Sequence, residues 1–171
     1  QGDCLKVMQD ISNKSVDMIL CDLPYGMTQN KWDSVIPLDE LWREYNRVIK
    51  DNGAIILFSQ GLFSAHLIIS NPKNYKYEWI WQKEQGTGFL NANRTPLKNH
   101  ENILVFYKKQ PIYNPQMREG KPYITTKGSR SSNYASTDKI VTTENKGKRY
   151  PLTVLSFKRD KDKFHPTQKP I

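Results

Sequence analysis

The chain has 171 residues, of which 37% are hydrophobic and 11% aromatic, a composition that supports one domain with a sizeable core and excludes intrinsic disorder as the default. It contains neither a long apolar run nor a basic start followed by an apolar block, so we expect a cytoplasmic protein without a membrane span or signal peptide. The net charge of +9 is unevenly placed: residues 1–107 contain 11 Lys or Arg and 12 Asp or Glu, whereas residues 108–171 contain 15 and 5.

The first half of the chain alternates strand-like and helix-like segments. A nearly continuous apolar run at 16–21 predicts a strand that is covered on both faces. Apolar residues then recur with helical spacing from Leu38 to Ile49, and Asn52 with Gly53 is expected to end that helix. Another buried strand is predicted at 54–58.

The following segments complete a sheet. A helix is expected from residue 61 to about residue 70, and strands are expected at 77–83 and 102–108. This order predicts an α/β fold with a mostly parallel sheet that ends in a hairpin-like pair. From about residue 110 to 163 the periodicity is lost, which predicts an irregular basic insert.

The basic insert is rich in Ser, Thr, Asn, Gly and Tyr with interspersed Lys and Arg. Such a composition suits contact with the phosphates and bases of nucleic acid. A solvated, poorly ordered basic loop would have the same composition.

The segment around Asp22 has the chemistry of a binding site. This acid ends the apolar run 16–21, and ligands of open parallel sheets bind outside the carboxyl ends of strands. Pro24 biases Leu23 toward an extended backbone, so the Leu23 carbonyl can act as a second acceptor beside the ring of Tyr25. Two acceptors and an aromatic face suit a planar base with an NH₂ group. The simpler alternative is an acid that only forms a turn.

Four motifs in chain order identify a resemblance. They are "QGDCLKVM" at 1–8, "DLPYG" at 22–26, "NHENILVFYKK" at 99–109 and "HPTQKP" at 165–170. Together they resemble the amino-group DNA methyltransferases with a D-P-P-Y-type motif, in the class whose target-base half precedes the cofactor half. The resemblance implies a Rossmann-like fold of the S-adenosylmethionine-dependent type and a flipped target base.

The resemblance assigns the catalytic roles to residues Asp22, Leu23, Pro24 and Tyr25. Asp22 and the Leu23 carbonyl would hold the amino hydrogens, and Tyr25 would stack on the flipped base. Leu23 stands where most members have proline, which is tolerable because the role belongs to the backbone. No general base is required, so alignment and electrostatics would supply most of the rate. Asp rather than Ser at position 22 favours adenine N6 over cytosine N4.

The resemblance also assigns residues to S-adenosyl-L-methionine. The expected cofactor-binding residues are Asp3, Cys4, Asp22, Phe58, His165, Thr167, Gln168 and Lys169. The F-x-G-x-G turn of the family does not occur in the 171 residues, so we expect an incomplete cofactor site in an incomplete chain. The one Gly-x-Gly, at 86–88, is interpreted as a loop near the target base.

The implied domains are a catalytic α/β core at 1–109, a target-recognition region at 110–163 and the start of the cofactor half at 164–171. The leading hypothesis is a site-specific adenine-N6 methyltransferase of a restriction-modification system, acting on double-stranded DNA. The alternatives are a methyltransferase acting on cytosine N4 or on RNA, and a non-catalytic DNA-binding homologue. A homodimer is also considered. Scattered histidines and two cysteines without paired spacing predict no metal site.

Overall fold

A computed structural model describes residues 2–31, 33–127 and 140–158. The chain divides into two compact units, one formed by residues 1–112 with 153–171 and the other by residues 113–152. Within the described residues, we find no helix long and apolar enough to cross a membrane.

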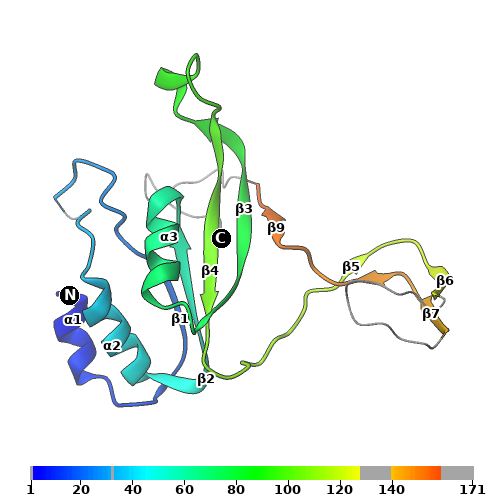
Figure 1. Cartoon of the computed structure of the whole chain (residues 1–171), viewed down its shortest axis with the longest axis horizontal. Coiled ribbons are helices and arrows are strands. Elements are labelled where there is room, and N and C mark those ends of the chain that lie inside the picture. The colour runs from blue at the N-terminus through cyan, green and yellow to red at the C-terminus, as the bar shows by residue number, and fades with distance from the viewer. Residues whose placement is uncertain (1, 32, 128–139, 159–171) are drawn as a thin grey trace. The chain divides into compact units, whose positions relative to one another are not determined.

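The first unit is built on a five-stranded sheet in the order β1-β2-β4-β3-β9 (Figure 1). β2 runs parallel to β1, β9 runs parallel to β3, and β4 is antiparallel to both of its neighbours. The predicted α/β fold and its hairpin are confirmed. The sheet is mixed because the connection between the two hairpin strands is too short for a crossover, so these strands run antiparallel. The strands are β1 (Val16–Asp22), β2 (Ile49–Ser59), β3 (Tyr75–Thr87), β4 (Lys98–Phe106) and β9 (Val154–Ser156).

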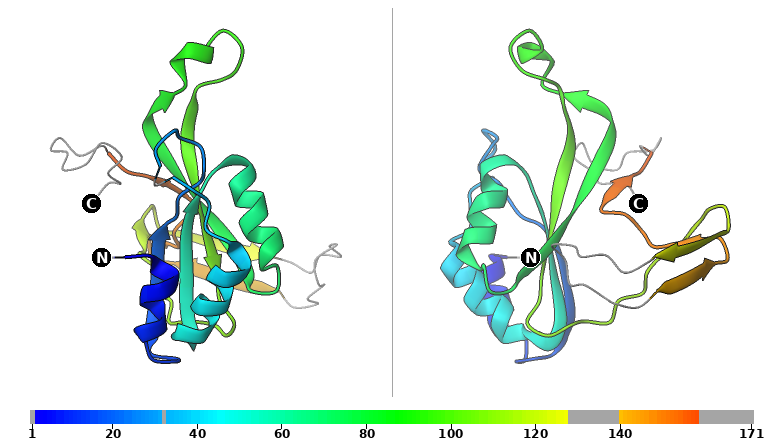
Figure 2. Two further views of the ribbon diagram at one scale, coloured as in Figure 1. Left: turned by 90° about the vertical axis from the view of Figure 1, so that its left-hand side faces the viewer. Right: turned by 45° about the vertical axis from the view of Figure 1, so that its right-hand side comes forward.

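The helices α1, α2 and α3 lie on one face of this sheet, as the views of Figures 1 and 2 show. On α2, apolar residues at helical spacing are buried against the strands, and the Trp42 ring lies 4.9 Å from that of Phe106. The Trp42 indole N–H donates to Ser70 at the end of α3, at 2.7 Å. The helices are α1 (Cys4–Val7), η1 (Met8–Asp10), α2 (Leu38–Val48), α3 (Gly61–Ser70) and η2 (Phe89–Asn91).

The end of α2 differs from the sequence prediction. The helix ends at Val48, and Asn52 and Gly53 lie inside β2 rather than ending a helix. The β1–β2 register shifts at this point, and a Cβ on Gly53 would lie 2.7 Å from the carbonyl oxygen of Asp17. Glycine is therefore required by close strand contact, which a sequence pattern cannot distinguish from a helix stop.

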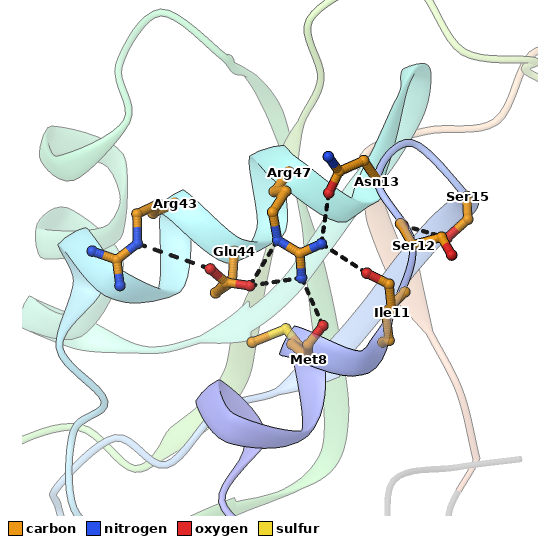
Figure 3. A network of polar contacts seen from close by, with 8 residues as sticks. All are labelled: Met8, Ile11, Ser12, Asn13, Ser15, Arg43, Glu44 and Arg47. Carbon is orange, nitrogen blue, oxygen red and sulfur yellow. Dashed lines mark hydrogen bonds and ion pairs between the residues drawn. The ribbon is translucent and has the colours of Figure 1, made fainter.

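A buried charge cluster fixes the segment before β1 to α2 (Figure 3). The Arg47 guanidinium donates to the carbonyls of Met8 and Ile11 at 2.6 and 2.7 Å, and to Asn13 at 2.7 Å. It also pairs with Glu44, whose carboxylate is buried, at 2.8 Å. The Arg47 side chain thus supplies hydrogen-bond donors to η1, to the loop that follows it and to a buried acid.

The second unit consists of two small antiparallel pairs, β5 with β8 and β6 with β7. The Arg149 guanidinium lies 4.5 Å from the centre of the Tyr123 ring. The strand β9, which falls within the predicted insert 110–163, belongs instead to the sheet of the first unit. The strands are β5 (Arg118–Glu119), β6 (Tyr123–Lys127), β7 (Val141–Asn145) and β8 (Lys148–Arg149).

Replacement of Arg47 with Met should lower the free energy of unfolding by about 2–4 kcal/mol, because the buried Glu44 carboxylate loses its short ion pair and two carbonyls lose a charged donor. Urea denaturation of the full chain measures this. Arg43→Met is the matched control, because Arg43 is largely exposed and lies 3.9 Å from the same acid. Arg43→Met should lower the free energy of unfolding by less than about 0.5 kcal/mol. Equal losses in the two variants would contradict the structural role of Arg47.

Candidate active site

The carboxyl ends of β1 and β2 meet at one edge of the sheet. Asp22, the last residue of β1, is the register partner of Phe58 on β2. The Phe58 ring meets that of Trp81 on β3 edge to face, with ring centres 6.5 Å apart. The structure therefore brings together two predicted site residues, Asp22 and Phe58, and adds Trp81, which the sequence analysis did not assign to the site.

Tyr25 is hydrogen-bonded to the acid that it follows. Its hydroxyl donates to Oδ1 of Asp22 at 2.7 Å, and its ring lies 5.2 Å from that of Phe63 on α3. Burial, followed by the hydrogen bond to Asp22 and nearby negative charge that includes Glu101, raises the pKa of Tyr25 well above its ordinary value. The hydroxyl therefore stays protonated at neutral pH and remains a donor that orients the Asp22 carboxylate.

The side chain of Leu23 explains how the loop accepts a residue other than proline. It is 6% exposed and belongs to the apolar core formed by the sheet, α2 and α3. Burial of this side chain anchors the loop by packing, where proline would restrict the backbone. The role predicted for the Leu23 carbonyl remains a prediction.

Asp33 holds the loop after Tyr25, and the sequence analysis missed it. Its carboxylate accepts hydrogen bonds from the backbone amides of Gly26, Met27 and Thr28 at 2.9, 2.9 and 2.6 Å. Gly26 has a φ of +68°, which favours glycine. An acid seven positions beyond a glycine forms no recognisable local pattern, because only the folded loop brings the groups together.

The hydrogen bonds to Asp33 affect its ionisation. Hydrogen bonds from the Thr28 side chain and from the three amides lower the pKa of Asp33 to about 2, although burial opposes this shift. The carboxylate is therefore charged throughout the physiological range.

A buried acid, Glu101, lies at the edge that carries Asp22. The ammonium of Lys83 on β3 pairs with the carboxylate of Glu101 on β4 and lies 5.1 Å from the centre of the Trp81 ring. Glu101 is 6% exposed, whereas its neighbour His100 is exposed. Glu101 belongs to the motif "NHENILVFYKK", and its burial and ion pair place this part of the motif at the same edge.

The N-terminal residues Asp3 and Cys4 lie at the start of α1. The Asp3 carboxylate caps this helix by accepting from the Leu5 amide at 2.9 Å. Burial raises the pKa of the Cys21 thiol, which also receives a hydrogen bond from Tyr45 and lies near enough to Asp22 and Cys4 to be affected by their charge. The start of α1 is thus close to the end of β1, and the cofactor role of both residues remains a prediction.

The other predicted cofactor residues, His165, Thr167, Gln168 and Lys169, lie outside the described residues. In the described part of the chain, three or more His, Cys, Asp or Glu side chains do not gather in a group that could hold a metal.

Comparison with known proteins identifies the family. The sequence profile of a family described as DNA methylase, N6_N4_Mtase, matches residues 16–171. The chain belongs to this N6/N4 DNA methylase family.

Two curated relatives illustrate the sequence similarity. The Type II methyltransferase M.HinfI of Haemophilus influenzae is 28% identical over 155 residues, which cover 70% of this chain and 43% of the relative. The Type II methyltransferase M.BglII of Bacillus subtilis is 27% identical over 199 residues, which cover 99% of this chain and 52% of the relative. The chain spans about half the length of these relatives.

Solved structures share the fold. The PvuII DNA methyltransferase (cytosine-N4-specific) matches with a TM-score of 0.60 and 9% identity, over 95% of this chain and 57% of the other. M1.HpyAVI matches with a TM-score of 0.54 and 20% identity, over 72% of this chain and 63% of the other. At these identities the likeness confirms the α/β fold of DNA methyltransferases.

Acid should weaken the fold partly through Asp33. Because its folded pKa is depressed to about 2, its contribution to stability is complete above the unfolded pKa near 4 and is lost as the pH falls from there. In Asp33→Asn this part of the acid-induced loss should be absent, and the variant should already be less stable at pH 7. Urea denaturation between pH 2 and 7 measures both effects.

Asp10→Asn, which changes an exposed acid of η1, is the control for the Asp33 variant. It should retain the acid-dependent loss of stability that wild type shows. If Asp33→Asn follows the wild-type pH profile, the three amide contacts do not stabilise the loop as inferred.

Proposed function

We propose that this chain is the target-base half of a site-specific DNA methyltransferase, which transfers a methyl group from S-adenosyl-L-methionine to the N6 amino group of adenine in duplex DNA. The observation that carries this proposal is the Asp22 carboxylate at the carboxyl end of β1, bonded to the Tyr25 hydroxyl and set against Phe58. Membership of the DNA methylase family supports the reaction class.

The residues of the loop suit an amino group that must act as a nucleophile. The Asp22 carboxylate and the Leu23 carbonyl accept its two hydrogens, which directs the nitrogen lone pair away from the ring of the base. As the nitrogen bonds to the methyl carbon, the bond from that carbon to sulfur breaks and the neutral thioether of the donor leaves. Positive charge develops on the nitrogen, and the carboxylate stabilises that charge. The proton then passes from the nitrogen to water.

The edge of the sheet also suits the methyl donor. S-adenosyl-L-methionine supplies, when bound, a methyl group on a positively charged sulfonium. Asp22 offers a negative charge, and Phe58, its register partner, offers an aromatic surface, which favours a cation beside it. M1.HpyAVI, which shares this fold with a TM-score of 0.51, has been solved as a complex with SAM.

The choice of adenine rests on the acid at position 22 through the family resemblance. Transfer to cytosine N4 is the second candidate, because the PvuII enzyme that shares the fold is cytosine-N4-specific. Both bases present an exocyclic NH₂ group, so the same two acceptors serve either one. Mass spectrometry of nucleosides from methylated DNA distinguishes N6-methyladenine from N4-methylcytosine.

The second unit is proposed as the main part of the target-recognition region. Residues 113–152 contain eight Lys or Arg and three Asp or Glu. Exposed Tyr123, Ile124 and Tyr150 lie among these charges. Cations bind phosphates and exposed aromatic rings stack on bases, so this composition fits DNA as the partner.

The Asp22→Ala variant of the full-length protein should lose transfer of labelled methyl from S-adenosyl-L-methionine to duplex DNA, by at least about 100-fold, because an acceptor and its charge are removed. Asp17→Ala is a matched control, since Asp17 is an exposed acid near the opposite end of β1. It should retain near-normal transfer. Near-normal transfer by Asp22→Ala would refute the site assignment.

Replacement of residues 113–152 by a short Gly/Ser linker should weaken DNA binding and reduce its salt dependence, because each phosphate contact contributes about 0.9 to the slope of log K against log salt. Residues 153–158 are retained because β9 belongs to the main sheet. Fluorescence anisotropy with labelled duplex DNA measures the slope. Unchanged affinity and slope would show that the second unit does not contact DNA.

A further inference from the structure

The turn between β3 and β4 presents two large apolar side chains to solvent. Phe89 is 70% exposed and Leu90 is fully exposed, both on η2. Single exposed apolar residues are common and need no explanation. Here, however, two adjacent ones stand at the end of a long hairpin, which Figures 1 and 2 show clear of the helices in every view.

This turn is a folded structure. Four backbone hydrogen bonds of 2.8–3.1 Å close it. The amide of Asn91 donates to the carbonyl of Gly88, and that of Ala92 donates to Phe89. The amides of Arg94 and Thr95 both donate to the carbonyl of Asn91. Gly88 has a φ of +94°, which favours glycine. A Cβ on Gly86 would lie 2.6 Å from that of Leu97, so the two sides of the hairpin are in close contact. Phe89 and Leu90 are therefore held out by an ordered turn, which reduces the entropy cost of binding.

The hairpin extends beyond the edge that carries Asp22. Asp22 pairs with Phe58, and Phe58 with Ile103 on β4, whereas β4 begins at Lys98. The hairpin therefore continues past the level of Asp22 by roughly 17 Å, at about 3.4 Å per residue. Its turn therefore lies beyond the carboxyl end of β1, where the proposed function places the target base.

The charge of the hairpin end suits nucleic acid. Residues 86–100 include Arg94 and Lys98 and contain neither Asp nor Glu. Arg94 is exposed and Lys98 is partly exposed. Cations beside protruding apolar side chains match a duplex, whose phosphates attract the cations and whose base steps admit apolar wedges.

We propose that the hairpin end, residues 86–98, is a wedge that contacts the DNA flanking the target base. Arg94 and Lys98 bind phosphates, and Phe89 and Leu90 insert between base pairs from the minor groove. Insertion unstacks a neighbouring step and so lowers the cost of extruding the target base. This inference rests on the proposed function, because DNA must approach the Asp22 edge.

Leu90→Ala in the full-length protein should raise the Kd for duplex DNA about ten-fold, as expected for the loss of one stacking or inserting side chain. Ile69→Ala is the matched control, because Ile69 is a 73% exposed aliphatic residue near the end of α3 in the same unit. It should leave the Kd within about two-fold. Arg94→Ala should reduce the slope of log K against log salt by about 0.9.

A photo-crosslinking amino acid at position 90 tests the contact directly. Labelled duplex DNA should be captured at position 90 and not at position 69. Capture of a second copy of the chain, or of another part of the same chain, in place of DNA would overturn the wedge. If wild type methylates DNA, Leu90→Ala binds DNA like Ile69→Ala, and the photo-crosslinking amino acid at position 90 captures no DNA, the wedge fails alone. If wild type neither binds nor methylates DNA, the proposed function fails with it.

Discussion

The parallel pairing of β1 with β2 is the constraint on which the site depends. The helix α2 returns the chain between these strands, so both of their carboxyl ends reach the same edge of the sheet and Asp22 lies beside Phe58. β4 runs antiparallel to β2, so the first residues of β4 extend past this edge. The ion pair of Lys83 with the buried Glu101 lies at this edge, and the hairpin turn lies beyond it, for the same reason.

Fixed hydrogen bonds orient the charged groups of this edge. Asp22 receives a bond from Tyr25, Asp33 receives three from the backbone, and Glu101 pairs with Lys83. These contacts form within the chain itself, without substrate. The proposed methyl transfer would develop charge on a nitrogen, and it would gain most from dipoles and charges that, like these, need no reorganisation.

The packing of Leu23 links the loop to the core. Its side chain is buried against the apolar cluster, while the catalytic role proposed for this residue belongs to its backbone. Burial of an apolar side chain therefore anchors the loop at this position. Arg47 acts similarly at a distance, because it fixes the segment that leads into β1.

Apolar periodicity and the motif around Asp22 are local properties of the chain, so the sequence was sufficient to predict the α/β fold, the hairpin and the family. Lys83 and Trp81 were not predicted as parts of the candidate site because their partners lie on other strands, and Asp33 was not predicted because its contacts form only when the loop closes. Gly53 was interpreted as the end of a helix, whereas the close approach of Asp17 requires glycine within a strand. These contacts depend on strand register and loop closure, which become fixed only when the chain folds.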